Sequence, residues 1–594
     1  MKTTQFIFQF RATLVAGALL LVAGCVITMS PADRAVPTSP MAPRAIASTP
    51  ARQAATTAHP LATRAALKML DQGGSAIDAA IAAQMVLGLV EPQSSGIGGG
   101  TLIMHWDAAN KKLTSFDGLA AAPASVTAAL TIDIDGSVLK SEDVQRGGRS
   151  VGAPGTLAVL KAVHERYGRL AWSALFVPAV EIAESGFPMP AYMHGILSAP
   201  TAAADHPDML PLFFGADGKV RPIGATITNP VYAATMRRIA LRGPAGMWEE
   251  GAGAALVAAA QRGFRPSLIT EADLAGNRAQ PRDPLCAPFL AYSVCVMGPS
   301  SFGGVVVLQV LQMIEARSPP ARGAGRFNFD DPEFVHYYAE AGRLAQADRL
   351  NYVGDPGFVR VPTEVLVSGN YARDRSRLID ASRMSKDVQP GVVAAKVAEA
   401  PPVAAAEAEA ADATSQLAIV DADGNALSMT TTINLNFGSR LMVDGFVLNN
   451  AMTNFSAASR AGQPAPNRMQ PGKRPVTSMA PTIVFDAVGK PLIVGGSAGG
   501  GQIVDYISTS LIEMLGNRRT PAEALARGHV STAIRGKLQL EKGTSAAAQA
   551  AALGAKGHDV DVVPMISGLG FLMRRDGGWV GAADPRRDGV AEGG

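Results

Sequence analysis

The feature that most constrains this 594-residue chain is a hairpin pattern that follows a segment with few core-forming residues. Residues 415–434, SQLAIVDADGNALSMTTTIN, contain two strand-like runs around Asp423 and Gly424, a pair typical of a tight hairpin turn. Residues 394–413 are mostly alanine and glutamate with two prolines, and we expect an exposed connection there. Thr414 lies at the junction. Because threonine is common at the start of any strand, its position alone assigns no function.

The composition excludes some classes of partner. A hydrophobic content of 47% allows a large core in a chain of this length. The net charge is only +3, and no lysine and arginine cluster of the kind that neutralises phosphates is present, so we expect no nucleic-acid partner. The eight histidines have no ligand-like spacing, so we predict neither a metal site nor a cofactor.

Residues 1–24 have the pattern of an export signal. Lys2 and Arg11 precede an apolar run that is too short to span a bilayer. The run ends in LVAGC, which resembles a bacterial lipobox, so we expect Cys25 to carry a lipid and to anchor an exported, periplasmic protein to a membrane. A plain signal peptide with a chance cysteine is the alternative.

The body of the chain has a tether followed by helical and strand patterns. Residues 25–60 are rich in proline, serine, threonine and alanine, so we predict a flexible tether and a fold that begins near Leu61. Apolar residues at helical spacing behind Ser75, with Asp78 as a capping-box partner, predict a buried helix. A second helix is predicted over residues 331–352.

Two cysteines remain after the export segment. Cys286 and Cys295 are close in sequence, and in an oxidising compartment this spacing suits one local disulfide across a hairpin or loop. Two buried thiols are the alternative.

Several glycine-rich and polar stretches then occur in a specific order. A single piece such as SSGIGGG also fits a tight turn or a phosphate-binding loop. The ordered set resembles the γ-glutamyltransferase (glutathione hydrolase) family of N-terminal-nucleophile hydrolases, and it covers almost everything from residue 61 onward. The stretches are GGSAIDAAIAAQMVLGLVEPQSSGIGGG, SVGAPGTLAVL, GPSSFGG, EAGRLAQADRLNYVGDPGFV, TSQLAIVDADGNALSMTTTINLNFGS, LNNAMTNFS, PGKRPVTSMAPTIV, GGSAGGGQI and ADPRRDG.

The resemblance implies an α/β fold, a four-layer αββα sandwich, and a precursor that cuts itself before a threonine. On this sequence the cut falls before Thr414, giving a large subunit of residues 61–413 and a small subunit of residues 414–594 that stay associated. The threonine hydroxyl attacks the preceding carbonyl to form an ester that water opens. Afterwards the hydroxyl is the nucleophile and the freed α-amine, with an ordinary pKa of about 8, can act as the base.

The resemblance also assigns roles within the catalytic centre. Thr432 is similar to the family's second threonine, which hydrogen-bonds the nucleophile. Gly499 and Gly500 are similar to its oxyanion hole, where backbone N–H groups reach a carbonyl oxygen without a Cβ in the way. For substrate binding the resemblance implies Asn434, Asn454, Thr477 and Ser478, the last two standing in place of a serine pair that holds the α-carboxylate.

The acyl pocket departs from the family pattern. In DGLAAAP, Leu119 and Ala120 replace an arginine and an acid, so the family's clamp on the glutamyl carboxylate is absent. Ala451 replaces Glu or Gln, and Asn454 replaces the aspartate that pairs with the α-ammonium group. Two histidines of the family pattern are Gln93 and Gln416 here.

Three functional hypotheses follow. The first is a self-processing amide hydrolase or acyltransferase that cleaves γ-glutamyl amides such as glutathione through a threonine acyl-enzyme. The second is an acylase of a glutaryl or other acyl amide, because the substitutions make the pocket more apolar; Arg149 and Arg440 are candidates for a replacement cation. The third is a non-catalytic surface lipoprotein that keeps the scaffold, although the retained threonines and glycines argue against it.

Overall fold

A computed structural model describes most of the chain after the predicted export segment. The described ranges are 44–45, 50–127, 141–199, 207–262, 265–317, 327–393, 413–456, 465–533 and 536–594. The predicted signal sequence, the predicted lipidation site Cys25, and residues 394–412 of the predicted connection 394–413 lie outside these ranges. Within them, no helix has both the length and the apolar character needed to cross a bilayer.

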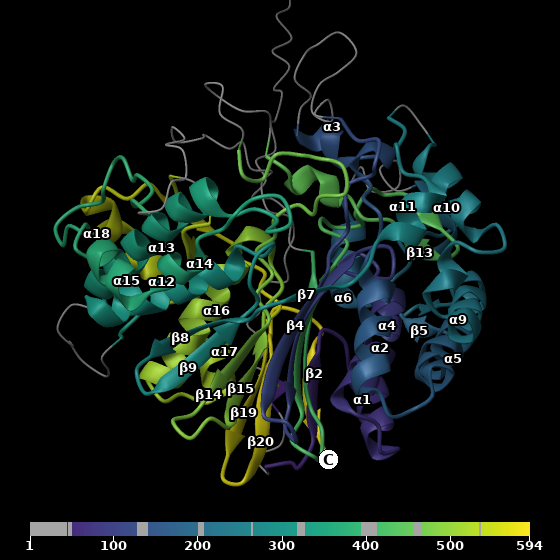
Figure 1. Ribbon diagram of the computed structural model, residues 1–594, viewed down its shortest axis with the longest axis horizontal. Coiled ribbons are helices and arrows are strands. Elements are labelled where there is room, and N and C mark those ends of the chain that lie inside the picture. The colour runs from purple at the N-terminus through teal and green to yellow at the C-terminus, as the bar shows by residue number, and fades with distance from the viewer. Residues whose placement is uncertain are drawn as a thin grey trace, which may run out of the picture. The chain divides into compact units, whose positions relative to one another are not determined.

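Two antiparallel seven-stranded sheets form the centre of the unit Val36–Gly594 (Figure 1). The first sheet has the order β21 (Val590–Gly593), β2 (Ala54–Thr57), β10 (Ser415–Val420), β11 (Ala426–Thr432), β3 (Gly100–Asp107), β4 (Lys112–Gly118) and β7 (Gln280–Arg282). The second has the order β1 (Arg44–Ala45), β20 (Gly578–Ala583), β19 (Gly570–Arg575), β15 (Pro491–Gly496), β14 (Thr482–Phe485), β9 (Tyr292–Val296) and β8 (Leu285–Phe289). Strands β10 and β11 of the first sheet pack against β15 of the second.

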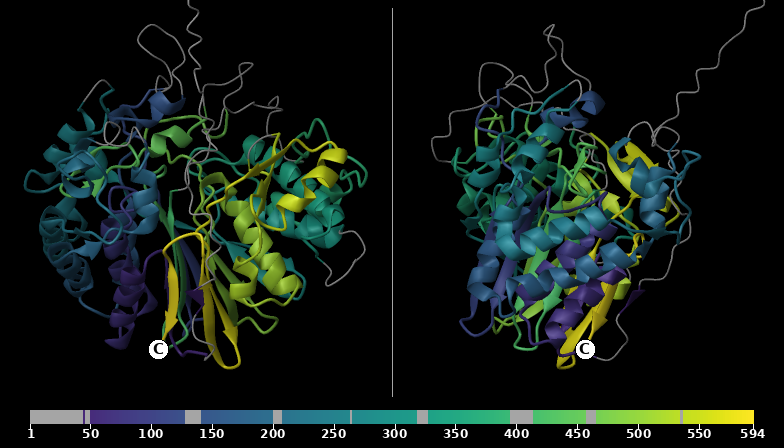
Figure 2. Two further views of the ribbon diagram at one scale, coloured as in Figure 1. Left: turned by 180° about the vertical axis from the view of Figure 1, so that it is seen from behind. Right: turned by 90° about the vertical axis from the view of Figure 1, so that its right-hand side faces the viewer.

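Helices cover the outer face of each sheet (Figure 1). On the side of the first sheet lie α1 (Pro60–Asp71), α2 (Ala76–Val90), α4 (Thr156–Tyr167), α5 (Val177–Ser185) and α9 (Pro230–Arg242). On the side of the second lie α12 (Gly303–Ala316), α13 (Pro332–Tyr352), α15 (Gly369–Ser376) and α16 (Ile503–Leu511). Figure 2 shows the C-terminal strands, in yellow, between these two helical layers. The predicted αββα sandwich is confirmed.

Shorter helices and strands lie outside the two seven-stranded sheets and the main helices. They are α3 (Ser141–Gln145), α6 (Ala191–Leu197), α8 (Leu210–Phe213), α10 (Ala252–Ala260), α11 (Glu271–Gly276), α14 (Thr363–Leu366), α17 (Pro521–Leu525), α18 (Ala550–Ala555), β5 (Phe187–Pro188), β6 (Thr226–Ile227), β12 (Met442–Val443), β13 (Phe446–Val447), β16 (Val530–Ser531), β17 (Leu538–Glu541) and β18 (Val560–Val563).

Strand β10 is buried on both faces, and its side chains alternate between two hydrophobic cores. Leu417 and Ile419 join the core beneath α2, whereas Ala418 and Val420 join the core between the sheets. This alternation follows from the two-residue period of a strand. Every residue of α2 is buried as well. The start of β10 is therefore fixed by packing from both sides.

Three local predictions are confirmed. The hairpin of β10 and β11 turns at Gly424, whose φ of +83° favours glycine. Helix α2 begins with the capping box formed by Ser75 and Asp78. Helix α13 occupies the second predicted helical segment.

The predicted boundary between tether and fold is wrong. Strand β2 lies within the predicted tether of residues 25–60, where its four buried residues pair with β10 and β21. Ala51 also pairs with Trp579. The sequence AATT has no alternation that would reveal a strand, and the partners that stabilise it are hundreds of residues away. The fold consequently begins before Leu61.

The predicted disulfide is confirmed. Cys286 on β8 and Cys295 on β9 lie directly opposite each other and are bonded. Because β8 is the edge strand of the second sheet, the disulfide links this edge strand covalently to its neighbour β9.

We expect reduction of this disulfide to lower the free energy of unfolding by roughly 2–3 kcal/mol, the entropy of closing a loop of this length. Thermal unfolding followed by circular dichroism, with and without dithiothreitol, measures the effect as a lower midpoint. The matched control is a variant carrying Cys286→Ser and Cys295→Ser, whose midpoint should not respond to the reductant. An identical midpoint for the unchanged protein in both conditions would contradict the prediction.

Candidate active site

Thr414 lies at the start of β10 and is only 4% exposed. Its hydroxyl donates a hydrogen bond to the Oγ1 of Thr432, at the end of β11, over 3.0 Å. The same Thr432 oxygen accepts a bond of 2.8 Å from the backbone N–H of Asn434. Because hairpin pairing places the start of β10 beside the end of β11, the fold itself brings the two predicted catalytic threonines together.

The backbone of Thr414 has an unusual conformation. Its φ is +98°, a value that costs a β-branched residue about 1–3 kcal/mol. Two hydrogen bonds hold it there. The Thr414 N–H donates to the Ser94 carbonyl over 3.1 Å, and Nη1 of Arg587 donates to the Thr414 carbonyl over 2.9 Å. Strain of this kind is often found at functional sites.

A buried carboxyl group lies beside the next residue. The Ser415 hydroxyl donates to Oε2 of Glu91 over 2.8 Å and accepts from the Ser95 hydroxyl over 3.0 Å. Burial raises the pKa of Glu91 to about 7, while the nearby Arg587 acts in the opposite direction. Sequence reasoning missed Glu91 and Arg587, although an acid directly after a largely apolar helix was an available signal for Glu91.

Gly499 and Gly500 form the turn between β15 and α16. Their φ values are +127° and +58°, and a Cβ on Gly499 would lie 2.5 Å from a ring carbon of Tyr506. The turn leads into the N-terminal end of a helix, where N–H groups and the helix dipole favour a negatively charged oxygen. Glycine is therefore required here, as an oxyanion hole also demands.

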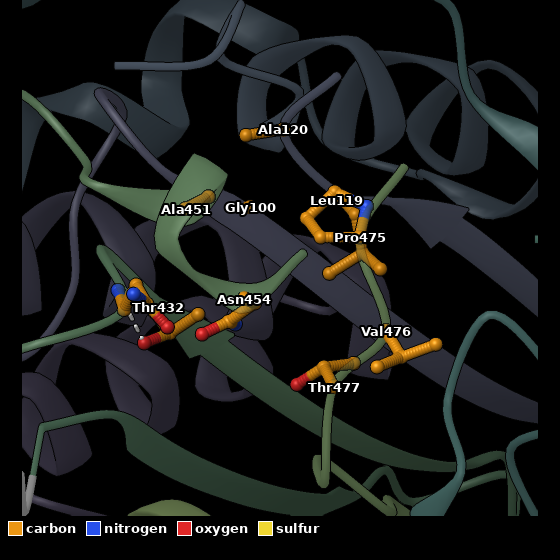
Figure 3. A pocket seen from close by; sticks show the side chains of 10 residues that line it. Gly100, Leu119, Ala120, Thr432, Ala451, Asn454, Pro475, Val476 and Thr477 are labelled. Atoms are coloured by element: carbon orange, nitrogen blue, oxygen red, sulfur yellow. Dashed lines mark hydrogen bonds between the residues drawn. The ribbon is translucent and has the colours of Figure 1, made fainter. Parts of the chain in front are cut away.

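A pocket opens next to Thr432 (Figure 3). Its lining residues are Gly100, Leu119, Ala120, Thr432, Asn434, Ala451, Asn454, Pro475, Val476 and Thr477. Thr432, Asn454 and Thr477 lie along one side, and Leu119 and Ala120 lie opposite. The pocket thus has one polar side and one apolar wall.

The pocket brings together four of the predicted site residues, Thr432, Asn434, Asn454 and Thr477. Thr414 is not a lining residue and reaches the pocket through its bond to Thr432. The Asn434 amide nitrogen donates to the Thr453 hydroxyl over 2.9 Å, which fixes its orientation.

Ser478 has a different environment from its neighbour Thr477. It does not line the pocket, and its hydroxyl donates to the Gly500 carbonyl over 2.6 Å. This contact supports the glycine turn. A substrate contact for Ser478 stays a prediction.

No lining residue of the pocket among the described residues is cationic. Arg474 lies close to Leu119, but its Nη1 pairs with the Asp117 carboxylate at 3.0 Å and its Nη2 donates to Asn277 at 3.0 Å. Arg282 pairs with the same carboxylate at 3.3 Å. Arg474 and the partly buried Arg282 are thus paired with Asp117 and do not replace the clamp that is missing at Leu119.

Ala451 and Asn454, two further departures from the family pattern, line the pocket, whereas Gln416 does not. Arg149 and Arg440, the candidates for a replacement cation, are not among the described residues that line it. Gln416 points between the sheets, where it donates to Ser428 over 3.1 Å and accepts from Thr430 over 2.6 Å. It has a structural role within the sandwich.

The four-layer fold is that of the N-terminal-nucleophile hydrolases, the class that includes the gamma-glutamyltranspeptidases. The sequence matches the family described as gamma-glutamyltranspeptidase over residues 62–594, and the chain belongs to that family. It is an enzyme of the amide hydrolase and acyltransferase type that this family comprises.

Two curated relatives and two solved structures illustrate the similarity. The chain is 31% identical to a glutathione hydrolase proenzyme of Bacillus subtilis (strain 168) over 472 residues, covering 77% of this chain and 76% of the relative. It is 31% identical to the acylase ACY 1 proenzyme of Pseudomonas sp. (strain SE83) over 548 residues, covering 90% and 92%. Cephalosporin acylase from Bacillus halodurans superposes with a TM-score of 0.78 at 24% identity over 93% of this chain and 97% of that one. Helicobacter pylori gamma-glutamyltranspeptidase superposes with a TM-score of 0.52 at 28% identity over 56% and 94%.

The contact between Thr414 and Thr432 can be tested without altering either residue. A Cβ on Gly99 would lie 2.0 Å from the Thr432 carbonyl oxygen, so Gly99→Ala must displace the end of β11. We expect amide turnover to fall by about 100-fold, as is typical of a 1 Å misplacement. The matched control is Gly276→Ala, whose Cβ would meet nothing within 4 Å. Wild-type turnover in folded Gly99→Ala protein would contradict the assigned geometry.

Proposed function

We propose that the chain cuts itself between Ala413 and Thr414 and that Thr414 then hydrolyses or transfers the acyl group of an amide. The observation that carries the proposal is the hydrogen bond of 3.0 Å between the hydroxyls of Thr414 and Thr432 beside the pocket. A large subunit that ends at Ala413 and includes β2, and a small subunit of residues 414–594, result. In the first sheet β2 of the large part pairs between β21 and β10 of the small part, and β11 pairs with β3, which supports their continued association.

The cleavage step uses the hydroxyl of Thr414 on its own peptide bond. Its oxygen forms an ester bond to the carbonyl carbon of Ala413, the bond from that carbon to the Thr414 nitrogen breaks, and the nitrogen takes up the hydroxyl proton. Water then opens the ester. The strained φ of Thr414 supports this step, because a freed N-terminus no longer has to keep that conformation.

The catalytic step uses the same residue on an external amide. The hydroxyl oxygen bonds to the substrate carbonyl carbon, and its proton moves to the α-amine and then to the departing nitrogen. The N–H groups of Gly499 and Gly500 bind the negative oxygen, each donor contributing about 3 kcal/mol. Water or another acceptor then releases the acyl group. Asn434, Asn454 and Thr477 orient the substrate from the polar side of the pocket.

The acyl group that fits best has no free amino-acid head. The wall formed by Leu119, Ala120, Ala451 and Val476 offers no charge to a carboxylate. We therefore favour the amide of an uncharged acyl group, in keeping with the acylase relative. A glutaryl group lacks the α-ammonium group but keeps a carboxylate, so we expect it to fit less well than an uncharged acyl group. A γ-glutamyl amide such as glutathione is the second candidate, supported by the relatives named glutathione hydrolase and by the polar side chain of Asn454.

The site of action follows from the N-terminal sequence. We propose export through residues 1–24 and a lipid on Cys25 that anchors the associated subunits to a membrane facing the periplasm.

Self-cleavage predicts two fragments on a denaturing gel of the purified protein, with Thr414 as the N-terminal residue of the smaller one. Thr414→Ala should remain a single chain because it lacks the attacking hydroxyl. Thr414→Ser is the matched control and should still be cut. An uncut unchanged protein would rule out this mechanism of activation.

Substrate choice is measured by the release of a coloured amine from anilides. We expect turnover of glutaryl or simple acyl anilides to exceed that of the γ-glutamyl anilide. Leu119→Arg, combined with Ala451→Gln and Asn454→Asp, should raise γ-glutamyl turnover by about 30-fold or more, the effect of regaining a buried charge pair. Leu378→Arg, at an exposed leucine, controls for the added charge. Faster γ-glutamyl turnover by the unchanged protein would favour the second candidate.

A further inference from the structure

Arg587 contacts the backbone carbonyl of Thr414, whereas Thr432 contacts its hydroxyl. It lies in the loop between β20 and β21, is 5% exposed, and donates from Nη1 to the Thr414 carbonyl over 2.9 Å. Its guanidinium also stacks on the ring of Tyr192 in α6, with 4.8 Å between the guanidinium carbon and the ring centroid. The charge is therefore held in one place beside the residue that becomes the N-terminus.

Arg587 also packs against the segment that leads to the glycine turn. A Cβ on Gly568 would lie 3.2 Å from Nε of Arg587 and 2.7 Å from the Cβ of Ala498. Gly568 and Ala498 exchange two backbone hydrogen bonds, of 3.1 and 3.2 Å. Arg587 thus packs against Gly568, which is hydrogen-bonded to Ala498, the residue directly before Gly499.

Three titratable or charged groups, two of them acidic and one basic, lie near the first residues of β10. The end of α2 contributes Glu91, which is bonded to Ser415, and the loop between β20 and β21 contributes Arg587 and Asp588. Asp584, in the same loop, is paired with Arg586 at 3.2 Å. The contacts described for Thr414 from the other elements are the Thr432 hydroxyl and the Ser94 carbonyl, which are uncharged.

We propose that Arg587 is a positioning residue that holds the Thr414 carbonyl and keeps the freed α-amine of Thr414 uncharged. The inference rests on the proposed function above, because only a cut chain has this amine. A cation bonded to the carbonyl of the same residue disfavours an ammonium group, whereas an ionised Glu91 favours it. Burial raises the pKa of Glu91 to about 7, so near neutral pH this carboxyl is only partly ionised and the arginine dominates.

The test is the pH profile of kcat/KM on an acyl anilide. The rate falls on the acidic side as the amine takes up a proton. Arg587→Gln keeps an N–H donor but removes the charge, so the amine should protonate more readily and the midpoint of this acidic limb should move up by about one pH unit. Arg587→Lys keeps the charge and should leave the midpoint near its original value. Arg360→Gln, at an arginine whose side chain is 76% exposed, is the control for loss of a distant charge.

An unmoved or lower midpoint in cut, folded Arg587→Gln protein overturns the inference. If that variant stays uncut or does not fold, Glu91→Gln decides. Its midpoint should fall, since the amine then faces the arginine alone, and an unchanged or higher midpoint overturns the inference. An unchanged protein that is not cut at Thr414 instead refutes the proposed function, so the two failures are distinguishable.

Discussion

The burial of β10 on both faces is the constraint on which the site depends. The strand is paired with β2 on one edge and β11 on the other, and its alternate side chains belong to two separate cores. A shift of one residue would exchange these faces and place Leu417 and Ile419 in the wrong core. The register of the hairpin therefore fixes Thr414 beside Thr432, and packing rather than local contacts sets the distance between the two hydroxyls.

The strained conformation of Thr414 depends on groups from distant parts of the chain. Ser94 follows α2, Thr432 ends β11, and Arg587 precedes β21. A residue with an unfavourable φ persists only where its surroundings hold it. Because the three contacts come from separate elements, the precursor must fold almost completely before Thr414 is held in this way. Premature cleavage of an incomplete chain is thereby disfavoured.

Sequence reasoning succeeded where the signal was local and failed where it was not. The hairpin turn at Gly424, the capping box at Ser75 and the disulfide all involve residues fewer than ten positions apart, and ordered motifs identified the paired threonines. Strand β2 and the contacts of Arg587 depend on partners far away in the sequence, which no local pattern encodes. Ser478 is a third case. The sequence predicts a substrate contact for it, whereas its hydroxyl donates to the Gly500 carbonyl, a contact that depends on the tertiary fold.

Different parts of the scaffold position the paired threonines and the pocket wall. Thr414 and Thr432 lie at strand ends whose positions are set by two cores, whereas the pocket wall comes from Leu119 after β4, the turn at Ala451 and the segment before β14. Replacing an arginine by leucine at position 119 leaves Asp117 paired with Arg474 and Arg282, so no buried carboxylate is left without a partner. The wall can therefore lose its charge without a penalty to the sheet beneath it. This separation explains how the hydrogen-bonded pair of Thr414 and Thr432 can be kept while the pocket wall at Leu119 and Ala451 is uncharged.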